Sequence, residues 1–240
     1  MSELTNTLPS QSEKAAGNSY QPTGAWRFRF FRRLAAAALA GALLSTGTAL
    51  AECDTNICVA TGTCPVGFTG SCCTISGSHL LDDVTGRCSL NFGVKTVTVD
   101  ASATLKVAAG DSFSINAGNL IVQGLLQAPG AFQAPGVFLP AMVITVSGIF
   151  KTESVSNSPG TIDVKAKGTT DSGEVEITAG GSVMLLGKDF SADGGEALCG
   201  GYITITGASI SMTSPMHSNG RLGCDGGWIT LTATDGDVTI

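Results

Sequence analysis

The sequence predicts an all-β protein built as a right-handed, single-stranded parallel β-helix, a solenoid, with a disulfide-rich cap at its N-terminal end. Three observations support this prediction. A short motif recurs near the C-terminus, pairs of apolar residues separated by one residue recur along the chain, and all eight cysteines follow residue 52. In a solenoid each coil stacks on the coil before it, so the sequence should repeat with a period of about 20–50 residues.

The recurring motif reads CGGYITIT at 199–206 and CDGGWITLT at 224–232, and GEVEIT at 173–178 opens the same way without a cysteine. Each copy is followed by a second short run of β type, at 182–185, 209–212 and 237–240. Equivalent positions keep one chemical type from copy to copy, which favours stacked coils.

Stacking turns the equivalent positions into columns. We expect Val175, Ile203 and Ile229 to form one interior column. The threonines that follow them should form a neighbouring column, and glycine pairs should occupy the corners, where positive φ or a close backbone approach is needed. The threonines are Thr178, Thr206 and Thr232, and the corner glycines lie at 180–181, 194–195, 200–201 and 226–227.

Residues 1–51 are expected to be a leader. Four arginines between 27 and 33 precede an apolar run at 34–44, and Ala49-Leu50-Ala51 follows. A basic region, a short apolar core and an A-x-A site are typical of a secretory signal peptide, cleaved here after Ala51. The alternative is a membrane anchor, but the segment 34–51 is mostly Ala, Gly, Ser and Thr, which is marginal for a spanning helix. We therefore expect no stable membrane insertion after cleavage.

Residues 52–94 are expected to form a cysteine-rich cap in which disulfides replace a hydrophobic core. An even number of cysteines in an exported chain favours disulfides over catalytic thiols. A zinc module is the alternative, but the segment has no C-x-x-C pair and His79 is its only histidine. Six cysteines allow 15 pairings, and the sequence does not choose among them. They are Cys53, Cys58, Cys64, Cys72, Cys73 and Cys88.

Residues 95–240 are expected to form the coils of the β-helix. Apolar-x-apolar pairs begin about every eight residues from Val97, and polar or glycine-containing breaks separate them, which is a strand signal. A stretch with three prolines, 129–140, is expected to be a loop. A β-sandwich is the alternative fold, because its short strands have similar spacing. The pairs are Val97/Val99, Leu105/Val107, Phe113/Ile115, Leu120/Val122, Ile144/Val146 and Ile162/Val164.

The segments 200–212 (GGYITITGASISM) and 226–240 (GGWITLTATDGDVTI) resemble bacterial secreted parallel β-helix proteins of the pectin-lyase-like superfamily, in its haemagglutinin-type, non-enzymatic branch. Leu90-Asn91-Phe92-Gly93, followed by KTVTV at 95–99, resembles the first coil of such domains. The resemblance covers roughly residues 90–240. It implies a fold and an export route to the bacterial surface or medium, and no activity.

Enzymes of this superfamily work with clustered aspartates, a calcium site or a basic catalytic residue on one exposed face. The best match here is Asp189 and Asp193, near Lys188, with His217 and Arg221 one coil later. Asp189 and His217 are 28 residues apart, which is close to the length of one coil, so we expect them as vertical neighbours. A single acid per strand favours solvated side chains over an acid–base pair or a metal site, so we expect no catalytic residues and no cofactor.

Tyr202 and Trp228 are expected one coil apart, as a sugar-binding platform or as a hydrophobic corner cover. With Asp189 and His217 they are the candidate glycan contacts. Charged residues make up only 13% of the chain and its formal net charge is −6. A nucleic-acid partner is therefore not expected.

The expected function is a secreted or cell-surface, adhesin-like structural module without catalytic activity, in an oxidising compartment. The alternative is a carbohydrate-active β-helix protein, either a polysaccharide lyase or hydrolase or a glycan-binding module. Expected partners are an extracellular glycan or another surface protein.

Two further expectations concern the last coils. Cys199 and Cys224 should form a disulfide between coils. No polar cap follows Ile240, so we expect either a fragment of a longer β-helical protein or self-association through an open C-terminal coil.

Overall fold

The structure, a computed structural model, describes residues 53–81, 86–130, 140–155, 158–166, 173–194, 199–221 and 223–240. The expected leader at 1–51 lies outside these residues, and so does most of the expected loop at 129–140. The described chain consists of strands joined by short corners, with one short 3-10 helix, η1 (Thr55–Ile57). The protein is therefore all-β, as the sequence predicts.

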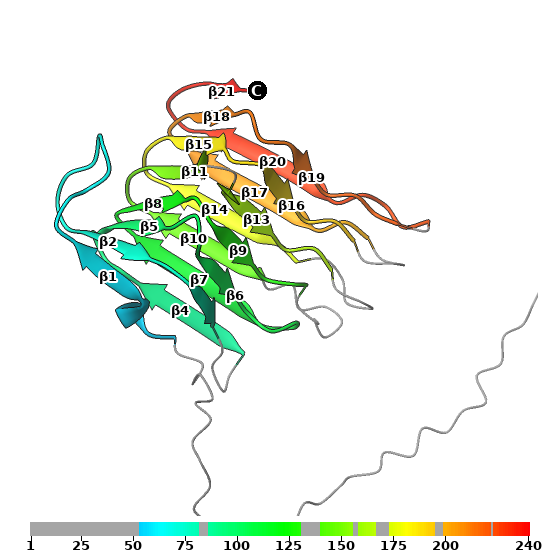
Figure 1. The fold of residues 1–240 in the computed structure, drawn as a ribbon. Helices are drawn as coiled ribbons and strands as arrows, with labels where there is room; N and C mark the ends of the chain where they lie inside the picture. Colours follow the sequence, from blue (N-terminus) through cyan, green and yellow to red (C-terminus); the bar gives the residue numbers. More distant parts are fainter. Residues whose placement is uncertain are drawn as a thin grey trace, which may run out of the picture. The chain divides into compact units, whose positions relative to one another are not determined.

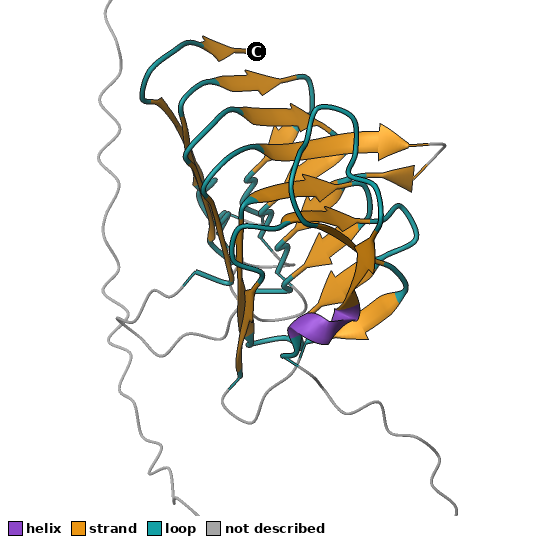
Figure 2. Ribbon diagram, turned by 90° about the vertical axis from the view of Figure 1, so that its left-hand side faces the viewer, coloured by secondary structure: helices purple, strands orange, loops and turns teal. Residues whose placement is uncertain are grey.

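The strands wind into a solenoid in which successive coils contribute to three sheets, called here A, B and C (Figures 1 and 2). Sheet A contains, in spatial order, β1 (Cys58–Thr61), β2 (Cys72–Ile75), β5 (Thr96–Val99), β8 (Asn119–Val122), β11 (Phe150–Val155), β15 (Val183–Leu186), β18 (Ile210–Met212) and β21 (Val238–Thr239), with β12 (Ser158–Pro159) beside β11. Sheet B contains β3 (Ser78–Leu80), β6 (Thr104–Lys106), β9 (Leu125–Gln127), β13 (Thr161–Asp163), β16 (Asp189–Ser191) and β19 (Met216–His217). Sheet C contains β4 (Arg87–Asn91), β7 (Ser112–Ala117), β10 (Met142–Val146), β14 (Val175–Ala179), β17 (Tyr202–Gly207) and β20 (Trp228–Ala233).

Strand pairing excludes the β-sandwich alternative. Neighbouring strands from successive coils run parallel in all three sheets, for example β14 beside β17 and β15 beside β18. Among the described residues, antiparallel pairing is confined to β1 with β2 and β11 with β12. A sandwich of this kind would instead be built from antiparallel strands.

The interior columns have the expected register. Val175 lies opposite Ile203, and Ile203 lies opposite Ile229. Val175 and Ile203 are fully buried, because alternate residues of a strand point to the same side and the coil closes around them. The apolar pairs predicted between residues 97 and 164 are all buried in this same core.

The corner glycines allow close backbone approach and do not adopt positive φ. A Cβ atom on Gly181 would lie 3.0 Å from the carbonyl oxygen of Gly148, one coil earlier. A Cβ atom on Gly227 would overlap the carbonyl oxygen of Gly201. The glycines with positive φ in the described chain lie elsewhere, Gly93 being one, with φ of 61°. Of the two reasons expected for corner glycines, close approach is therefore the one that applies here.

The cysteine-rich segment is partly a cap and partly a coil. β1 adds antiparallel to the edge of sheet A, while β2, β3 and β4 already pair in parallel with β5, β6 and β7. The coil thus begins at Cys72, earlier than the expected boundary at residue 95. The segment also contributes core residues, because the half-cystines Cys73 and Cys88 are buried beside Leu90.

All eight cysteines are paired. Cys53 bonds Cys88, Cys58 bonds Cys73, and Cys64 bonds Cys72, so the adjacent Cys72 and Cys73 have different partners. Cys199 bonds Cys224 across two coils, with Cα atoms 4.8 Å apart. Disulfides in this number are typical of proteins that fold in an oxidising, extracellular environment.

Candidate functional site

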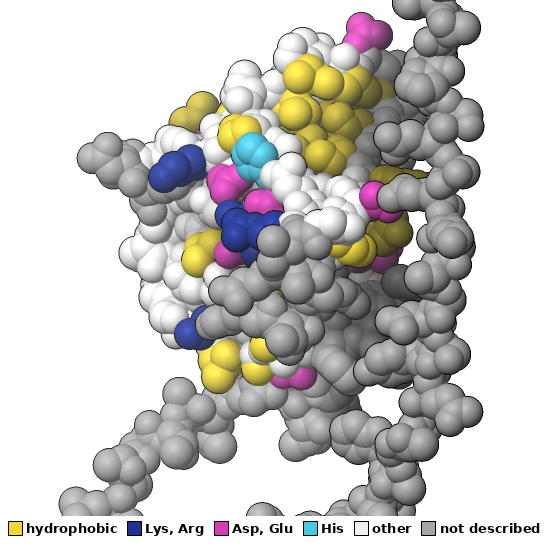
Figure 3. Space-filling model, turned by 90° about the vertical axis from the view of Figure 1, so that its right-hand side faces the viewer, with side chains coloured by type: hydrophobic (Ala, Val, Ile, Leu, Met, Phe, Trp, Pro, Cys, Tyr) yellow, Lys and Arg dark blue, Asp and Glu magenta, His cyan; other side chains and the backbone are white. Residues whose placement is uncertain are grey.

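The candidate site predicted from the sequence lies on the outer face of sheet B. Asp189 begins β16, His217 ends β19 and Lys165 follows β13. The Lys165 Nζ lies 3.7 Å from Asp189 Oδ2, and the His217 Nε2 lies 3.8 Å from Asp189 Oδ1. Figure 3 shows basic, acidic and histidine side chains gathered on one part of this face. The structure therefore brings Asp189 and His217 together. The two distances are too long for hydrogen bonds.

Asp193, on the same part of sheet B, accepts more hydrogen bonds than Asp189 does. Its Oδ1 accepts hydrogen bonds from the backbone N–H of Asn219 (2.9 Å) and from the Asn219 side-chain amide (3.0 Å). Its Oδ2 accepts a hydrogen bond from the Ser191 hydroxyl (3.0 Å) and lies 4.0 Å from the Lys165 Nζ. Oδ1 thus joins Asp193 to the following coil, while Oδ2 is bonded within its own coil and faces Lys165 of the preceding coil.

These contacts lower the pKa of Asp193. Partial burial acts to raise it, but the hydrogen bonds from Asn219 and Ser191 and the charge of Lys165 outweigh burial and favour the ionised carboxylate. A group whose pKa is depressed by folding stabilises the folded state above its unfolded pKa, and that contribution disappears as the pH falls through the folded pKa.

Replacement Asp193→Asn should therefore lower the free energy of unfolding at pH 7 and change it little in strong acid. The difference between the two proteins should begin to shrink below about pH 4, where a free aspartate titrates. Urea unfolding at a series of pH values measures this difference. A gap between the two proteins that stayed constant from pH 7 to pH 2 would contradict the ionic role of Asp193.

The register of sheet B differs from the expected one. His217 lies opposite Ser191, and Asp189 lies opposite Thr161. The expectation that Asp189 and His217 stack vertically, drawn from their 28-residue separation, is therefore wrong: Ser191 and His217 are separated by only 26 residues, because the corners differ in length. The two side chains still meet, but diagonally.

The chemistry available at this cluster is limited. Asp193 is fully engaged, Asp189 Oδ1 is a buried oxygen without a hydrogen-bond partner, and the residue that completes the cluster is a lysine. Within the residues that the structure describes, no group of three or more His, Cys, Asp and Glu side chains is arranged to hold a metal ion. The described chain likewise contains no helix long and apolar enough to span a bilayer.

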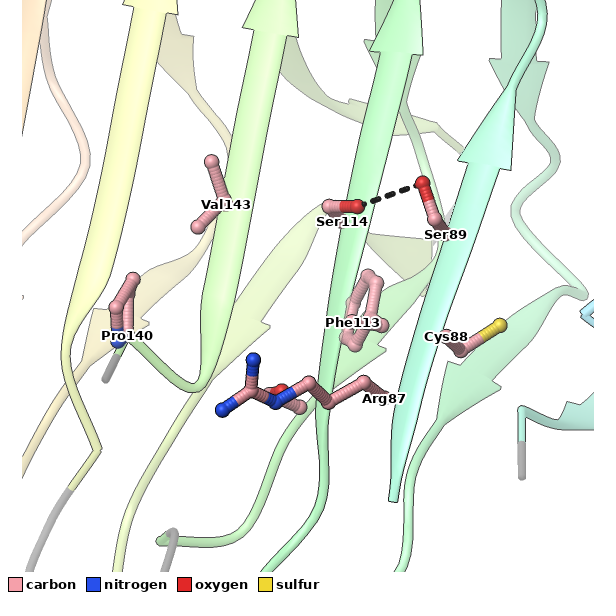
Figure 4. Close-up of a pocket in the computed structure, with 8 residues that line it drawn as sticks. Arg87, Cys88, Ser89, Phe113, Ser114, Pro140 and Val143 are labelled. Atoms are coloured by element: carbon pink, nitrogen blue, oxygen red, sulfur yellow. Dashed lines mark hydrogen bonds between the residues drawn. The ribbon is translucent and has the colours of Figure 1, made fainter. Parts of the chain in front are cut away.

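A pocket of about 300 Å³ lies near the other end of the molecule, over β4, β7 and β10 of sheet C (Figure 4). The Ser114 hydroxyl donates a hydrogen bond to the Ser89 hydroxyl (3.1 Å), and Arg87 extends across the strands toward Pro140. Among the described residues, the lining holds one cation and several hydroxyls and no carboxylate or histidine. These described residues therefore offer no acid–base pair.

The two candidate aromatic residues lie side by side. Tyr202 is opposite Trp228 at the start of β17 and β20, with ring centroids 6.0 Å apart and an interplanar angle of 82°. Both rings are exposed, Trp228 at 71%. The sequence predicted their adjacency, but not the edge-to-face arrangement, which does not form the flat platform expected for a sugar.

No protein-family model, curated protein or solved structure matches this chain.

Proposed function

We propose that this chain is a secreted or cell-surface structural module of adhesin-like type, without catalytic activity. The observation that carries the proposal is the use of the polar side chains on sheet B. The carboxylate of Asp193 connects neighbouring coils through Asn219. A catalytic acid or base instead needs an oxygen or nitrogen atom that is free to exchange a proton with the substrate.

The fold supports the same function in a second way. Parallel coils held by continuous backbone pairing form a rigid body in which outward residues of successive coils stand in columns. Four disulfides suit a protein that works outside the cell. The resemblance to haemagglutinin-type β-helix proteins points to a bacterial origin and an exported product, and belongs to this proposal.

The alternative is a carbohydrate-active β-helix protein that cleaves its ligand. It is favoured by the Asp189–His217 contact and by the exposed Tyr202–Trp228 pair. The two functions differ in one measurable outcome, the chain length of a polysaccharide after prolonged contact with the protein.

The test is incubation of the full chain with polygalacturonate, xylan, cellulose and starch, with and without calcium, followed by size analysis and detection of new reducing or unsaturated ends. The proposed function predicts unchanged chain length in every case. If any polymer is shortened, and Asp189→Asn or His217→Ala abolishes the cleavage, the ranking of the two functions reverses.

The last coil carries exposed apolar side chains at positions that are buried one coil earlier. Ile229 is 41% exposed where its equivalent Ile203 is fully buried, and Val238 is 40% exposed where Ile210 is 1% exposed. At the opposite end, β1 covers the edge of sheet A. We therefore propose that two copies associate through their C-terminal coils. Such a contact is isologous, which means that each copy contributes the same surface.

Replacement Ile240→Asp, at a side chain that is 85% exposed, should reduce this self-association by placing two carboxylates in the contact. Sedimentation velocity over a range of concentrations measures it. Val59→Asp is the matched control, since Val59 is 65% exposed on β1 at the other end. Equal effects of the two replacements, or a wild-type chain that remains monomeric at high concentration, would disprove association through the C-terminal coil.

A further inference from the structure

The outer face of the last two strands of sheet C has a composition found nowhere else on that sheet. Its side chains are an aromatic residue and two threonines from each strand, and this set is called here the β17–β20 face. It consists of Tyr202, Thr204, Thr206, Trp228, Thr230 and Thr232. β17 reads YITITG and β20 reads WITLTA, so neither strand contains a charged residue.

The register places these side chains in three short columns. Tyr202 lies opposite Trp228, Thr204 opposite Thr230, and Thr206 opposite Thr232. Ile203 and Ile205, on the inner side of β17, are fully buried and hold that strand against the core. The face is therefore a set of outward side chains on a well-packed base.

Earlier coils lack this pattern. At the position of Thr204, the preceding coils carry Ser89, Ser114, Val143 and Glu176. Glu176 brings a negative charge and Val143 brings no hydroxyl. The pairing of two threonines with an aromatic ring is thus confined to β17 and β20 among the described strands of sheet C.

The threonine hydroxyls of the face are available to a ligand. Within the described chain, none of the four makes a side-chain hydrogen bond. Thr230 and Thr232 are exposed, and Thr204 and Thr206 are half-buried. A hydroxyl both donates and accepts, so this face offers hydrogen bonds of both kinds.

Three features hold the face in place at the aromatic end. The Cys199–Cys224 disulfide joins the two segments that lead into β17 and β20. Gly227 donates a backbone hydrogen bond to the Ser218 carbonyl (2.8 Å), and Trp228 donates one to the Gly201 carbonyl (3.2 Å). The backbone that carries the two rings is thereby fixed before a ligand arrives, which lowers the entropic cost of binding.

We propose that the β17–β20 face binds a linear, uncharged polysaccharide. Aromatic faces stack on the apolar C–H face of a sugar ring, and hydroxyl side chains pair with the sugar hydroxyls beside it. Trp228 is the more exposed ring of the edge-to-face pair and provides the stacking surface. Tyr202 packs against it and supports it.

The repeat of the face suits such a polymer. Neighbouring strands lie about 4.8 Å apart, and residues two apart on a strand are separated by about 6.7 Å. Threonines that lie opposite each other on β17 and β20 are therefore separated by a distance comparable with the length of one sugar unit. The absence of charge on β17 and β20 favours a neutral polymer, since no cation is present there to pair with carboxylates or sulfates.

This inference rests on the proposed function, because it names the ligand of a structural module that binds without cleaving. The probes are insoluble cellulose, insoluble mannan and starch granules, with polygalacturonate gel as the charged comparison. Binding of the full chain is measured by depletion from solution at a series of protein concentrations. We expect saturable binding to at least one neutral polymer and none to polygalacturonate.

Two variants locate the binding. Trp228→Ala should weaken it by about tenfold, which corresponds to the loss of one stacking contact. The double replacement Thr204→Val/Thr230→Val removes two hydroxyls without changing side-chain shape, and should weaken binding at least as much. The matched control is Thr104→Val/Thr239→Val, on sheets B and A, which should bind like the wild type.

Absence of binding to every neutral polymer would overturn the proposal, as would equal binding by the control and by Thr204→Val/Thr230→Val. Tighter binding to polygalacturonate would overturn it too, by indicating a charged ligand. Circular dichroism and the thermal midpoint show whether Trp228→Ala and Thr204→Val/Thr230→Val remain folded. Binding with cleavage would contradict the non-catalytic function and leave the binding face intact, so the two failures are distinguishable.

Discussion

Replacement of Phe150 by alanine is expected to lower the free energy of unfolding by about 3–5 kcal/mol. Phe150 lies on β11 in the middle of sheet A and is fully buried. It stacks between Leu120 of the preceding coil and Val183 of the following coil. Truncation leaves a cavity that neighbouring coils cannot fill, because their backbones are fixed by hydrogen bonds on both sides.

Equilibrium unfolding in guanidinium chloride measures this loss for Phe150→Ala. The matched control is Phe68→Ala, at a half-buried phenylalanine in the loop between β1 and β2, for which the loss should be clearly smaller. Equal losses at the two positions would mean that Phe150 does not occupy the interior of a continuous core.

Removal of the Cys199–Cys224 disulfide should cost about 3 kcal/mol, since the bond closes a loop of intermediate length in the unfolded chain. The two cysteines are 25 residues apart. The single replacement Cys199→Ser should be as costly as Cys199→Ser/Cys224→Ser, because either one breaks the bond. Peptide mapping without reduction should recover the two cysteines joined in the wild type, and free thiols at both positions would contradict the bridge.

The same replacement should also affect the β17–β20 face, because the disulfide lies directly before Tyr202 and Trp228. The rings would lose a constraint at the end of each strand where they sit. Cys199→Ser/Cys224→Ser should therefore bind neutral polysaccharide more weakly than the wild type, even under conditions in which both remain folded.

The interior of the solenoid could be predicted from the sequence because it depends on local alternation. Each apolar-x-apolar pair points two side chains to one side of a strand, and a repeat near 27 residues returns the next pair to the same place. This is why Val175, Ile203 and Ile229 could be aligned before any coordinates were known.

The start of the coil could not be predicted in the same way. In the first coil, the interior is supplied partly by half-cystines such as Cys73 and Cys88, and counting aliphatic residues alone leaves this segment without a core. Leu81 and Leu90 are buried there as well.

The polar cluster was predicted only in part, because side-chain contacts on an outer face depend on register and corner length. Asp189 and His217 were expected to meet and do so diagonally. Lys165 was missed, although it contacts both Asp189 and Asp193. Lys165 belongs to the coil before Asp189, whereas the partners expected from the sequence lie in the same coil or in the next one.

The proposals for function and ligand both depend on one structural claim: outward residues of successive coils stand in fixed columns. The most direct test is disulfide cross-linking between threonines of sheet C. Thr178 lies opposite Thr206, and Thr206 lies opposite Thr232. Adjacent strands lie about 4.8 Å apart, within the Cα separation of roughly 4.4–6.8 Å that a disulfide needs, while two coils span about twice that distance.

The measurement is the yield of the new disulfide after mild oxidation, read by peptide mapping without reduction. Thr178→Cys/Thr206→Cys should cross-link nearly completely, and Thr178→Cys/Thr232→Cys should remain as free thiols. Efficient cross-linking of the second pair, or failure of the first in folded protein, would contradict the stacked register on which the account rests.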